Sequence, residues 1–262
     1  MADLHAPVVD SSPQQLQIIY QDEWLVAINK PAGLLVHRSA IDRHETRFAM
    51  QMLRDQIGQH VFPVHRLDKP TSGVLLFALN SDTARKMSDI FAARETAKAY
   101  LAVVRGYTDE QGVIDYPLKE ELDKKTDQQA TFYKEAQEAV TEYRRLAAVE
   151  LPYAVGRYQT ARYSLLHLMP RSGRKHQLRR HMKHIFHPIV GDTTHGDGKQ
   201  NTFFRQQFDC HRLLLHAAGL GFCHPQSGQS LHIHAPIDAS FQEAMDALGW
   251  SDQSLRQVDT RG

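Results

Sequence analysis

The segment His65-Arg66-Leu67-Asp68-Lys69-Pro70-Thr71-Ser72-Gly73 carries more information about fold and chemistry than any other short stretch of this chain. It is polar and charged, and it leads into residues 73–79, a short apolar run that is typical of a buried strand. A charged loop at the end of such a strand can present a reactive carboxylate, here Asp68. Taken alone, however, the segment is better explained as a turn in which Asp68 caps backbone amides and Gly73 permits a tight bend.

The composition limits the classes of protein that need to be considered. The chain has 262 residues, of which 42% are hydrophobic, enough to form a sizeable core in one large domain or two small ones. Lys and Arg number 31 against 30 for Asp and Glu, so a surface that binds nucleic acid must be local. Two cysteines in so long a chain argue against a disulfide scaffold and against a cysteine zinc site.

Cellular location is predicted from the same features. Residues 1–15 contain no apolar stretch long enough for a signal peptide or a membrane span. Low cysteine usage fits a reducing compartment. The sequence therefore predicts a cytoplasmic protein with no membrane association.

Apolar runs and turn signals predict more strands than helices. Strands are expected at residues 16–20, 24–28, 73–79, 100–104, 140–149, 161–169 and 212–222, and helices at residues 81–95, capped by Ser81, and 174–185. The two types do not alternate regularly, which favours an α+β domain with a large mixed, mostly antiparallel sheet flanked by helices and loops. We expect a flexible arm at residues 1–15, one domain at residues 16–248, with an exposed charged excursion at 119–142, and a tail at 249–262.

A concentrated positive stretch occupies residues 171–187. It contains four histidines, no acidic residue and six cations: Arg171, Arg174, Lys175, Arg179, Arg180 and Lys183. RNA, a polyanion, would gain favourable counterion release on such a surface, although a solvated helix face is the common alternative. Helical spacing places Arg174, Leu178 and Met182 or His181 on overlapping faces, so some cations must point inward or into a cleft. A half-buried arginine needs an anionic partner, and Asp68 is a candidate.

Five ordered motifs resemble those of the RluA-type pseudouridine synthases. The segment from His65 to Gly73 is similar to the catalytic loop of that family. The other four are Asn29-Lys30-Pro31-Ala32-Gly33 with His37, Lys98-Ala99-Tyr100, Gly173-Arg174-Lys175-His176-Gln177-Leu178-Arg179 with His181, and Leu215-His216-Ala217 with His224-Pro225. Together they extend over residues 16–235, and this combination makes the simple-turn explanation of Asp68 untenable.

The resemblance implies a fold, a reaction and a set of site residues. It implies a pseudouridine synthase catalytic domain at residues 16–248, without an S4 domain, because Asp68 lies too near the N-terminus to leave room for one. The implied catalytic residues are Asp68, Tyr100 and Arg179, and the implied substrate-binding residues are Arg66, His65, Lys98, Arg174, Lys175 and Leu215. Isomerisation of uridine needs no cofactor and no metal. The resemblance implies no protein partner.

Other segments refine the expected substrate. Residues 56–60 and 120–124, together with Pro70 and His195, resemble a member of the family that modifies tRNA at position 65. Ribosomal RNA and another tRNA site are the alternatives.

Within this resemblance each catalytic residue has an expected role. Asp68 would be ionised, with Arg179 as its partner, although the sequence leaves open whether it attacks the base, attacks the sugar or removes a ribose proton. Tyr100 would stack on the flipped uracil, and Arg66 would enter the RNA near the vacated base.

Two other classes of function remain as alternatives from the sequence. His181 and His184 have a spacing that suits a metal site, but no acidic residue occurs between residues 171 and 187, so a metal-dependent hydrolase is a remote alternative. An RNA-binding protein without activity is the third hypothesis. The joint presence of Asp68, Tyr100 and Arg179 argues against it.

Overall fold

The computed structural model describes residues 15–38, 45–119 and 135–250. The predicted N-terminal arm lies outside these residues except for Gln15, as do most of the charged excursion at 119–142 and the predicted tail beyond residue 250. Trp250, which falls within that predicted tail, is only 5% exposed and belongs to the same core cluster as Phe241. The folded part of the chain therefore extends at least to Trp250.

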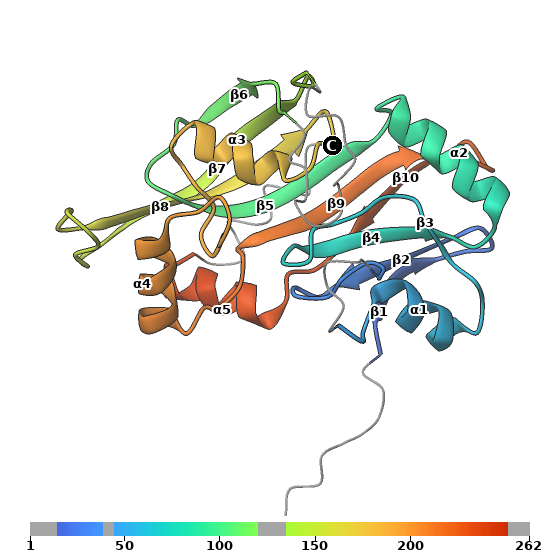
Figure 1. Cartoon of the computed structure of the whole chain (residues 1–262), viewed down its shortest axis with the longest axis horizontal. Helices are drawn as coiled ribbons and strands as arrows, with labels where there is room; N and C mark the ends of the chain where they lie inside the picture. The colour runs from blue at the N-terminus through green and yellow to red at the C-terminus, as the bar shows by residue number, and fades with distance from the viewer. Residues whose placement is uncertain (1–14, 39–44, 120–134, 251–262) are drawn as a thin grey trace, which may run out of the picture.

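One large sheet forms the centre of the molecule (Figure 1). Its ten strands are β1 (Gln17–Gln21), β2 (Leu25–Lys30), β3 (Phe62–Pro63), β4 (Ser72–Ala78), β5 (Ala97–Arg105), β6 (Gln111–Asp115), β7 (Val140–Leu151), β8 (Ala161–Pro170), β9 (Leu215–Cys223) and β10 (Ser230–His234). The main order is β1-β2-β4-β9-β5-β8-β7-β6, with β3 paired to β4 and β10 to β9. Among these strands only β4 and β9 pair in parallel, so the predicted mixed, mostly antiparallel α+β fold is confirmed.

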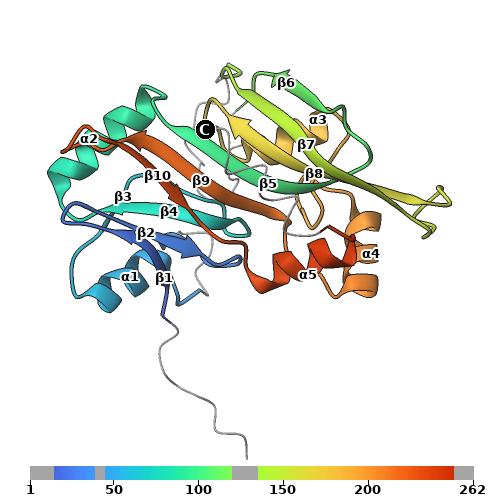
Figure 2. The ribbon, with the colours of Figure 1, turned by 180° about the vertical axis from the view of Figure 1, so that it is seen from behind.

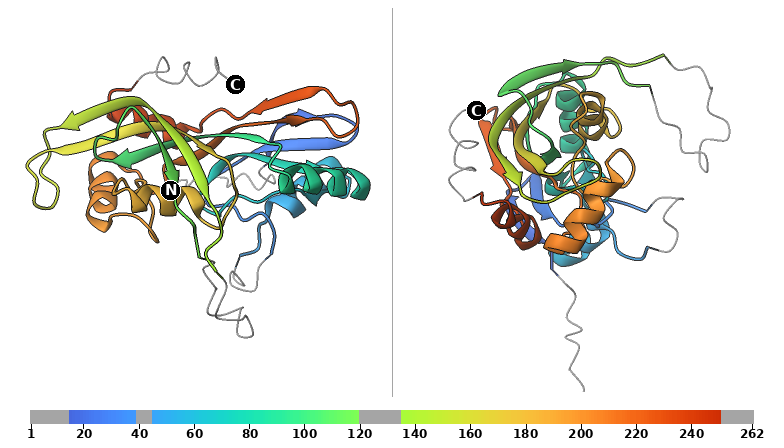
Figure 3. Two further views of the ribbon diagram at one scale, coloured as in Figure 1. Left: turned by 90° about the horizontal axis from the view of Figure 1, so that it is seen from above. Right: turned by 90° about the vertical axis from the view of Figure 1, so that its left-hand side faces the viewer.

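Five helices accompany the sheet: α1 (Ala49–Ile57), α2 (Ser81–Ala92), α3 (Gln177–His184), α4 (Gly198–Phe208) and α5 (Ala239–Ala247). In the view from above, α1 to α4 lie on one side of the sheet (Figure 3). In the view from behind, the strands lie in front of these helices (Figure 2). No helix in the described part of the chain is long and apolar enough to cross a membrane.

Two predicted helix starts differ from the structure. The predicted cap Ser81 is wrong, because Asn80 is the residue whose side chain accepts the N–H of Thr83. The helix expected from residue 174 begins at Gln177, because His176 has a left-handed backbone with φ 54° that cannot continue a helix.

The parallel contact between β4 and β9 brings the two halves of the sheet together. Ser72 lies opposite His216, and Gly73 lies opposite Ala217. A Cβ on Gly73 would stand 2.2 Å from the carbonyl oxygen of Ala217, and the residue has φ +112°, so only glycine fits. The loop that contains Asp68 is thereby placed over the centre of the sheet.

Candidate active site

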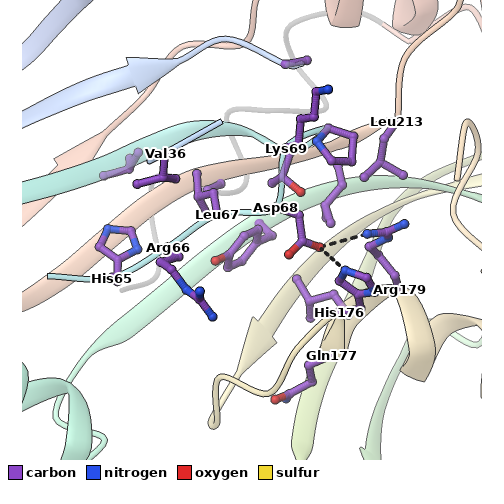
Figure 4. Close-up of a pocket in the computed structure, with 18 of the residues that line it drawn as sticks. Val36, His65, Arg66, Leu67, Asp68, Lys69, His176, Gln177, Arg179 and Leu213 are labelled. Atoms are coloured by element: carbon purple, nitrogen blue, oxygen red, sulfur yellow. Dashed lines mark hydrogen bonds and ion pairs between the residues drawn. The ribbon is translucent and has the colours of Figure 1, made fainter. Parts of the chain in front are cut away.

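All nine residues predicted for the site line one cleft. Figure 4 shows His65, Arg66, Asp68 and Arg179 among the residues that line it. The nine residues are His65, Arg66, Asp68, Lys98, Tyr100, Arg174, Lys175, Arg179 and Leu215. They come from the loop before β4, from β5, from the segment leading into α3, from α3 itself, and from β9. Residues that are 150 positions apart in the chain, such as His65 and Leu215, therefore meet in one place.

The structure places Asp68 and Arg179 in direct contact. The Nη1 atom of Arg179 donates to Oδ2 of Asp68 at 3.1 Å. The Arg179 side chain is 5% exposed, whereas that of Asp68 is 29% exposed. The carboxylate is therefore paired with a buried cation and still reachable from the cleft.

Arg179 has a second acidic partner, Asp192, which sequence reasoning missed. Its Nε and Nη2 atoms donate to the two Asp192 carboxylate oxygens at 2.7 and 2.8 Å. The backbone N–H groups of Thr194 and His195 donate to Oδ1 of the same carboxylate at 2.9 Å. The Asp two residues before Thr194 is typical of an Asx-turn, which is the one sequence signal that could have marked this carboxylate.

These contacts control the charges of the buried pair. Burial opposes ionisation of Asp192, but the hydrogen bonds from Arg179 and from the turn outweigh it and lower the pKa of Asp192. Burial likewise opposes the charge of Arg179, but Asp192 and then Asp68 raise its pKa. Arg179 is thus a permanent cation held between two carboxylates.

Tyr100 stands at an irregularity of β5. The pairing of β5 with β9 shifts register between Ala99 and Tyr100, and such bulges re-aim side chains. Burial, followed by the negative charge of Asp68, raises the pKa of the Tyr100 phenol well above its ordinary value. The hydroxyl is therefore a neutral hydrogen-bond donor at physiological pH.

His65 anchors the loop that contains Asp68. Its Nε2 atom accepts the backbone N–H of Leu76 on β4 at 3.0 Å, and its ring stacks on Phe91 of α2 with the centroids 5.2 Å apart. Burial, followed by the positive charge of Lys98, lowers the pKa of His65 to about 4, which keeps the ring neutral as an acceptor. Arg66, the next residue, is exposed in the cleft.

Lys30 ties the N-terminal motif to the same loop. Its side chain is fully buried, and its ammonium group donates to the carbonyl oxygens of Pro31, Leu34 and Lys69, the last at 3.1 Å. Burial lowers the pKa of Lys30 to about 7, while the negative charge of Asp68 opposes this change. Because Lys69 follows Asp68, this contact fixes the backbone beside the carboxylate.

Two histidines, His176 and His195, contact each other beside Asp68. The Nδ1 atom of His176 lies 2.9 Å from Nε2 of His195, and its own Nε2 lies 3.9 Å from Oδ2 of Asp68. The left-handed backbone of His176 is a conformation that non-glycine residues hold only when the surroundings enforce it. The motif containing His176 was recognised in the sequence, but its contact with His195 was not.

The sequence of this chain matches a known protein family. The family model described as RNA pseudouridylate synthase matches residues 24–184, which include Asp68, Tyr100 and Arg179. The chain belongs to the RNA pseudouridylate synthase family. It is therefore an isomerase that acts on uridine in RNA.

Several relatives of this RNA pseudouridylate synthase have similar lengths. The chain is 57% identical to tRNA pseudouridine synthase C of Vibrio parahaemolyticus, over 94% of this chain and 100% of that protein. It is 56% identical to tRNA pseudouridine synthase C of Haemophilus influenzae, over 90% of this chain and 99% of that protein.

Solved structures of lower identity share the fold. Human RNA Pseudouridylate Synthase Domain Containing 4 is 26% identical, with a TM-score of 0.66, over 89% of this chain and 93% of that one. Human RNA Pseudouridylate Synthase Domain Containing 1 is 24% identical, with a TM-score of 0.69, over 95% and 98% of the two chains.

A metal-dependent hydrolase, the remote alternative, would need a cluster of ligating side chains. Within residues 15–38, 45–119 and 135–250, no three His, Cys, Asp or Glu side chains converge as metal ligands do. The ring of His181 is engaged elsewhere, with Nδ1 3.0 Å from the Thr141 hydroxyl and Nε2 3.0 Å from the Tyr116 carbonyl oxygen.

Proposed function

We propose that this RNA pseudouridylate synthase modifies tRNA at position 65, with Asp68 as its catalytic carboxylate. The tRNA substrate is supported by relatives that are named tRNA pseudouridine synthase C and align over almost the full chain. Position 65 is supported by the resemblance of residues 56–60 and 120–124, the second of which lies outside the described residues. A cytoplasmic location is supported by two free cysteines, Cys210 and Cys223.

One observation carries the assignment of Asp68. Within the described part of the chain its side chain accepts one protein hydrogen bond, from Arg179, and it is open to the cleft. A carboxylate has about four acceptor positions. The remaining lone pairs of Asp68 can therefore accept a ribose proton or attack a carbon of the sugar or of the base.

The reaction constrains what the cleft must provide. The bond from ribose C1′ to uracil N1 breaks, the base turns, and C1′ joins C5. One proton leaves C5 and one arrives at N1, so no electrons are exchanged and no group departs. The three roles left open for Asp68 all need its ionised form, which the charge of Arg179 favours.

Tyr100 would contact the extruded base, and Arg66 would occupy the space that it leaves. A neutral phenol beside Asp68 offers a ring face for stacking, worth about 1–3 kcal/mol for a base, and a hydroxyl that can donate to it. Arg66 is exposed on the loop between two anchored residues, His65 and Asp68, and can occupy the space that the base vacates. Base flipping costs a few kcal/mol in a paired stem, and such contacts offset part of that cost.

The basic segment before and within α3 would bind the RNA backbone. Arg174 and Lys175 line the cleft, and Nε of Arg174 donates to the carbonyl oxygen of Glu138 at 3.2 Å, which orients the guanidinium. Phosphate contacts of this kind raise affinity without reading sequence.

The test is site-resolved pseudouridine mapping. Purified protein is incubated with unmodified tRNA transcripts and, separately, with ribosomal RNA transcripts, each with and without a metal chelator. We expect pseudouridine at tRNA position 65 in both chelator arms. Modification only of ribosomal RNA, or of a different tRNA position, would contradict the proposed target.

A further inference from the structure

Exposed aromatic side chains gather at one end of the molecule. Five aromatic side chains in the described part of the chain are exposed. All five lie between the end of β5 and the residues just after α3: Tyr107, Tyr116, Tyr153, Tyr158 and Phe186. Phe186 is the most exposed of them, at 78%. A phenylalanine so exposed gains little from folding, which suggests a role outside the fold.

The backbone of Phe186 adds a second reason. Its φ is 64°, in the left-handed region where glycine and asparagine are favoured and a bulky aromatic residue is strained. The position is fixed by the fold, because its N–H donates to the Lys183 carbonyl at 3.0 Å and its carbonyl accepts from Nη2 of Arg105 at 3.2 Å. Neither packing nor backbone preference therefore explains the ring.

Arginines alternate with the aromatic residues around Phe186. The guanidinium of Arg162 lies 5.3 Å from the centroid of the Tyr107 ring. That of Arg157 lies 5.0 Å from the Tyr158 ring, and it donates to the Tyr158 hydroxyl at 2.8 Å. We call Arg105, Tyr107, Arg157, Tyr158, Arg162 and Phe186 the arginine–aromatic face.

These residues are continuous in space. The backbone N–H of Gly106, which separates Arg105 from Tyr107, donates to the Arg162 carbonyl at 2.6 Å. Arg105 also pairs with Asp197, which lines the same hollow as Gly156, the residue before Arg157. Figure 1 shows the β7–β8 hairpin, α3 and α4 at the same end of the molecule. Phe186 lies two residues beyond the end of α3, the helix that carries Arg179.

The charge of this face favours a polyanion. Arg105 and Arg162 pair with Asp197 and Glu150. Arg157 and the neighbouring Lys183 and Lys199 add cations, so positive groups outnumber carboxylates. Arginine beside exposed aromatic rings suits RNA, since the guanidinium binds phosphate and the ring stacks on an unpaired base.

We propose that the arginine–aromatic face is a second RNA-binding surface, which holds part of the substrate outside the catalytic cleft, with Phe186 stacked on an unpaired base. The inference rests on the proposed function, because it takes an RNA substrate as given. It predicts that a full tRNA contacts this face and that a short hairpin containing only the modified stem does not.

The test compares two RNAs on four proteins. The RNAs are an unmodified tRNA transcript on which the wild-type protein forms pseudouridine, and a hairpin of the modified stem alone. The variants are Phe186→Asn, which tolerates the left-handed backbone but has no ring, Phe186→Trp, which keeps a stacking face, and Val113→Ser. Val113 is also apolar and 64% exposed, but it lies on edge strand β6, so it is the matched control.

Dissociation constants and single-turnover rates decide the outcome. Phe186→Asn should weaken binding of the tRNA by at least about fivefold, the lower limit for one stacked base, and leave hairpin binding and the saturated rate unchanged. Phe186→Trp and Val113→Ser should match the wild type. Unchanged tRNA affinity in Phe186→Asn overturns the proposal. It is the result expected if this face binds a protein and not RNA. An equal loss for tRNA and hairpin also overturns it. Failure of the proposed function would appear separately, as a wild-type protein that forms no pseudouridine in tRNA.

Discussion

Arg179 lies between two carboxylates of the same chemistry in opposite environments. Asp192 is 1% exposed and accepts four hydrogen bonds, two from Arg179 and two from the backbone of its own turn. Asp68 is 29% exposed and accepts one from the same guanidinium. Contact with a cation therefore does not distinguish a structural carboxylate from a candidate catalytic one. The acceptor capacity that remains after folding does.

The contrast also explains how the side chain of Asp68 is positioned. Asp192 orients Arg179 through two parallel bonds, a geometry that fixes the guanidinium plane. The third donor, Nη1, then points to Asp68. The buried pair positions the cation, and the cation positions the open carboxylate.

Removing the shared cation should have the largest effect. Arg179→Ala leaves Asp192 buried and unpaired, which costs about 3–5 kcal/mol of unfolding free energy, and it also deprives Asp68 of its partner. We expect loss of both stability and activity, measured by urea unfolding and by single-turnover pseudouridine formation. Arg180→Ala is the control, because Arg180 donates to the Lys119 carbonyl away from both carboxylates and should be nearly as stable as wild type. A stable, active Arg179→Ala would contradict the shared-cation account.

Neutralising the buried carboxylate should separate stability from chemistry. Asp192→Asn keeps the shape but replaces one acceptor oxygen by a donor, so at least one bond from Arg179 is lost. An unsatisfied buried group costs about 1–3 kcal/mol. We expect a protein with lowered stability and reduced but measurable turnover. Complete inactivity in a folded Asp192→Asn would mean that Asp192 itself takes part in the reaction.

Acid should reveal the same buried pair. The folded pKa of Asp192 is lowered, so its contribution to stability is complete above the unfolded value of about 3.9 and is lost as pH falls through the folded value. Thermal unfolding of wild type and Asp192→Asn should therefore converge as the pH drops below about 4. A difference in melting temperature that stays constant from neutral pH down to that range would show that the charge of Asp192 is not what stabilises the fold.

The smallest effect is expected at Tyr100. Its pKa is raised, so the phenol is neutral and Tyr100→Phe removes a donor without altering charge or ring face. We expect unchanged RNA affinity and a fall in single-turnover rate of about tenfold or less, the value of one neutral hydrogen bond. A pH-rate profile that changes shape in Tyr100→Phe would instead indicate that this hydroxyl exchanges its proton during the reaction.

The sequence predicted the parts of the fold that local patterns specify. The buried run at residues 73–79 is β4, because a continuous apolar run reflects a strand covered on both faces. The predicted strand at 161–169 is β8. Helices α1, α4 and α5 and strands β3, β6 and β10 were not predicted. β6 alternates only weakly, and α4 mixes polar and aromatic residues without a clear apolar face.

The candidate site was likewise predicted only in part from the sequence. Asp68, Tyr100 and Arg179 were identified because their motifs are contiguous and resemble a family. The partnership of Arg179 with Asp192 depends on a turn 13 residues later that folds back onto α3, and the contact of His176 with His195 spans 19 residues. Such pairings arise from tertiary packing, so no local periodicity encodes them.

The most direct test of the central claim is single-turnover pseudouridine formation by Asp68→Asn beside a tRNA-binding titration. This substitution keeps side-chain size and removes the negative charge from the open carboxylate. We expect no measurable pseudouridine, with tRNA affinity within a few-fold of wild type and stability reduced less than in Asp192→Asn. Substantial turnover by Asp68→Asn would contradict the assignment of Asp68 and, with it, the distinction drawn between the two carboxylates.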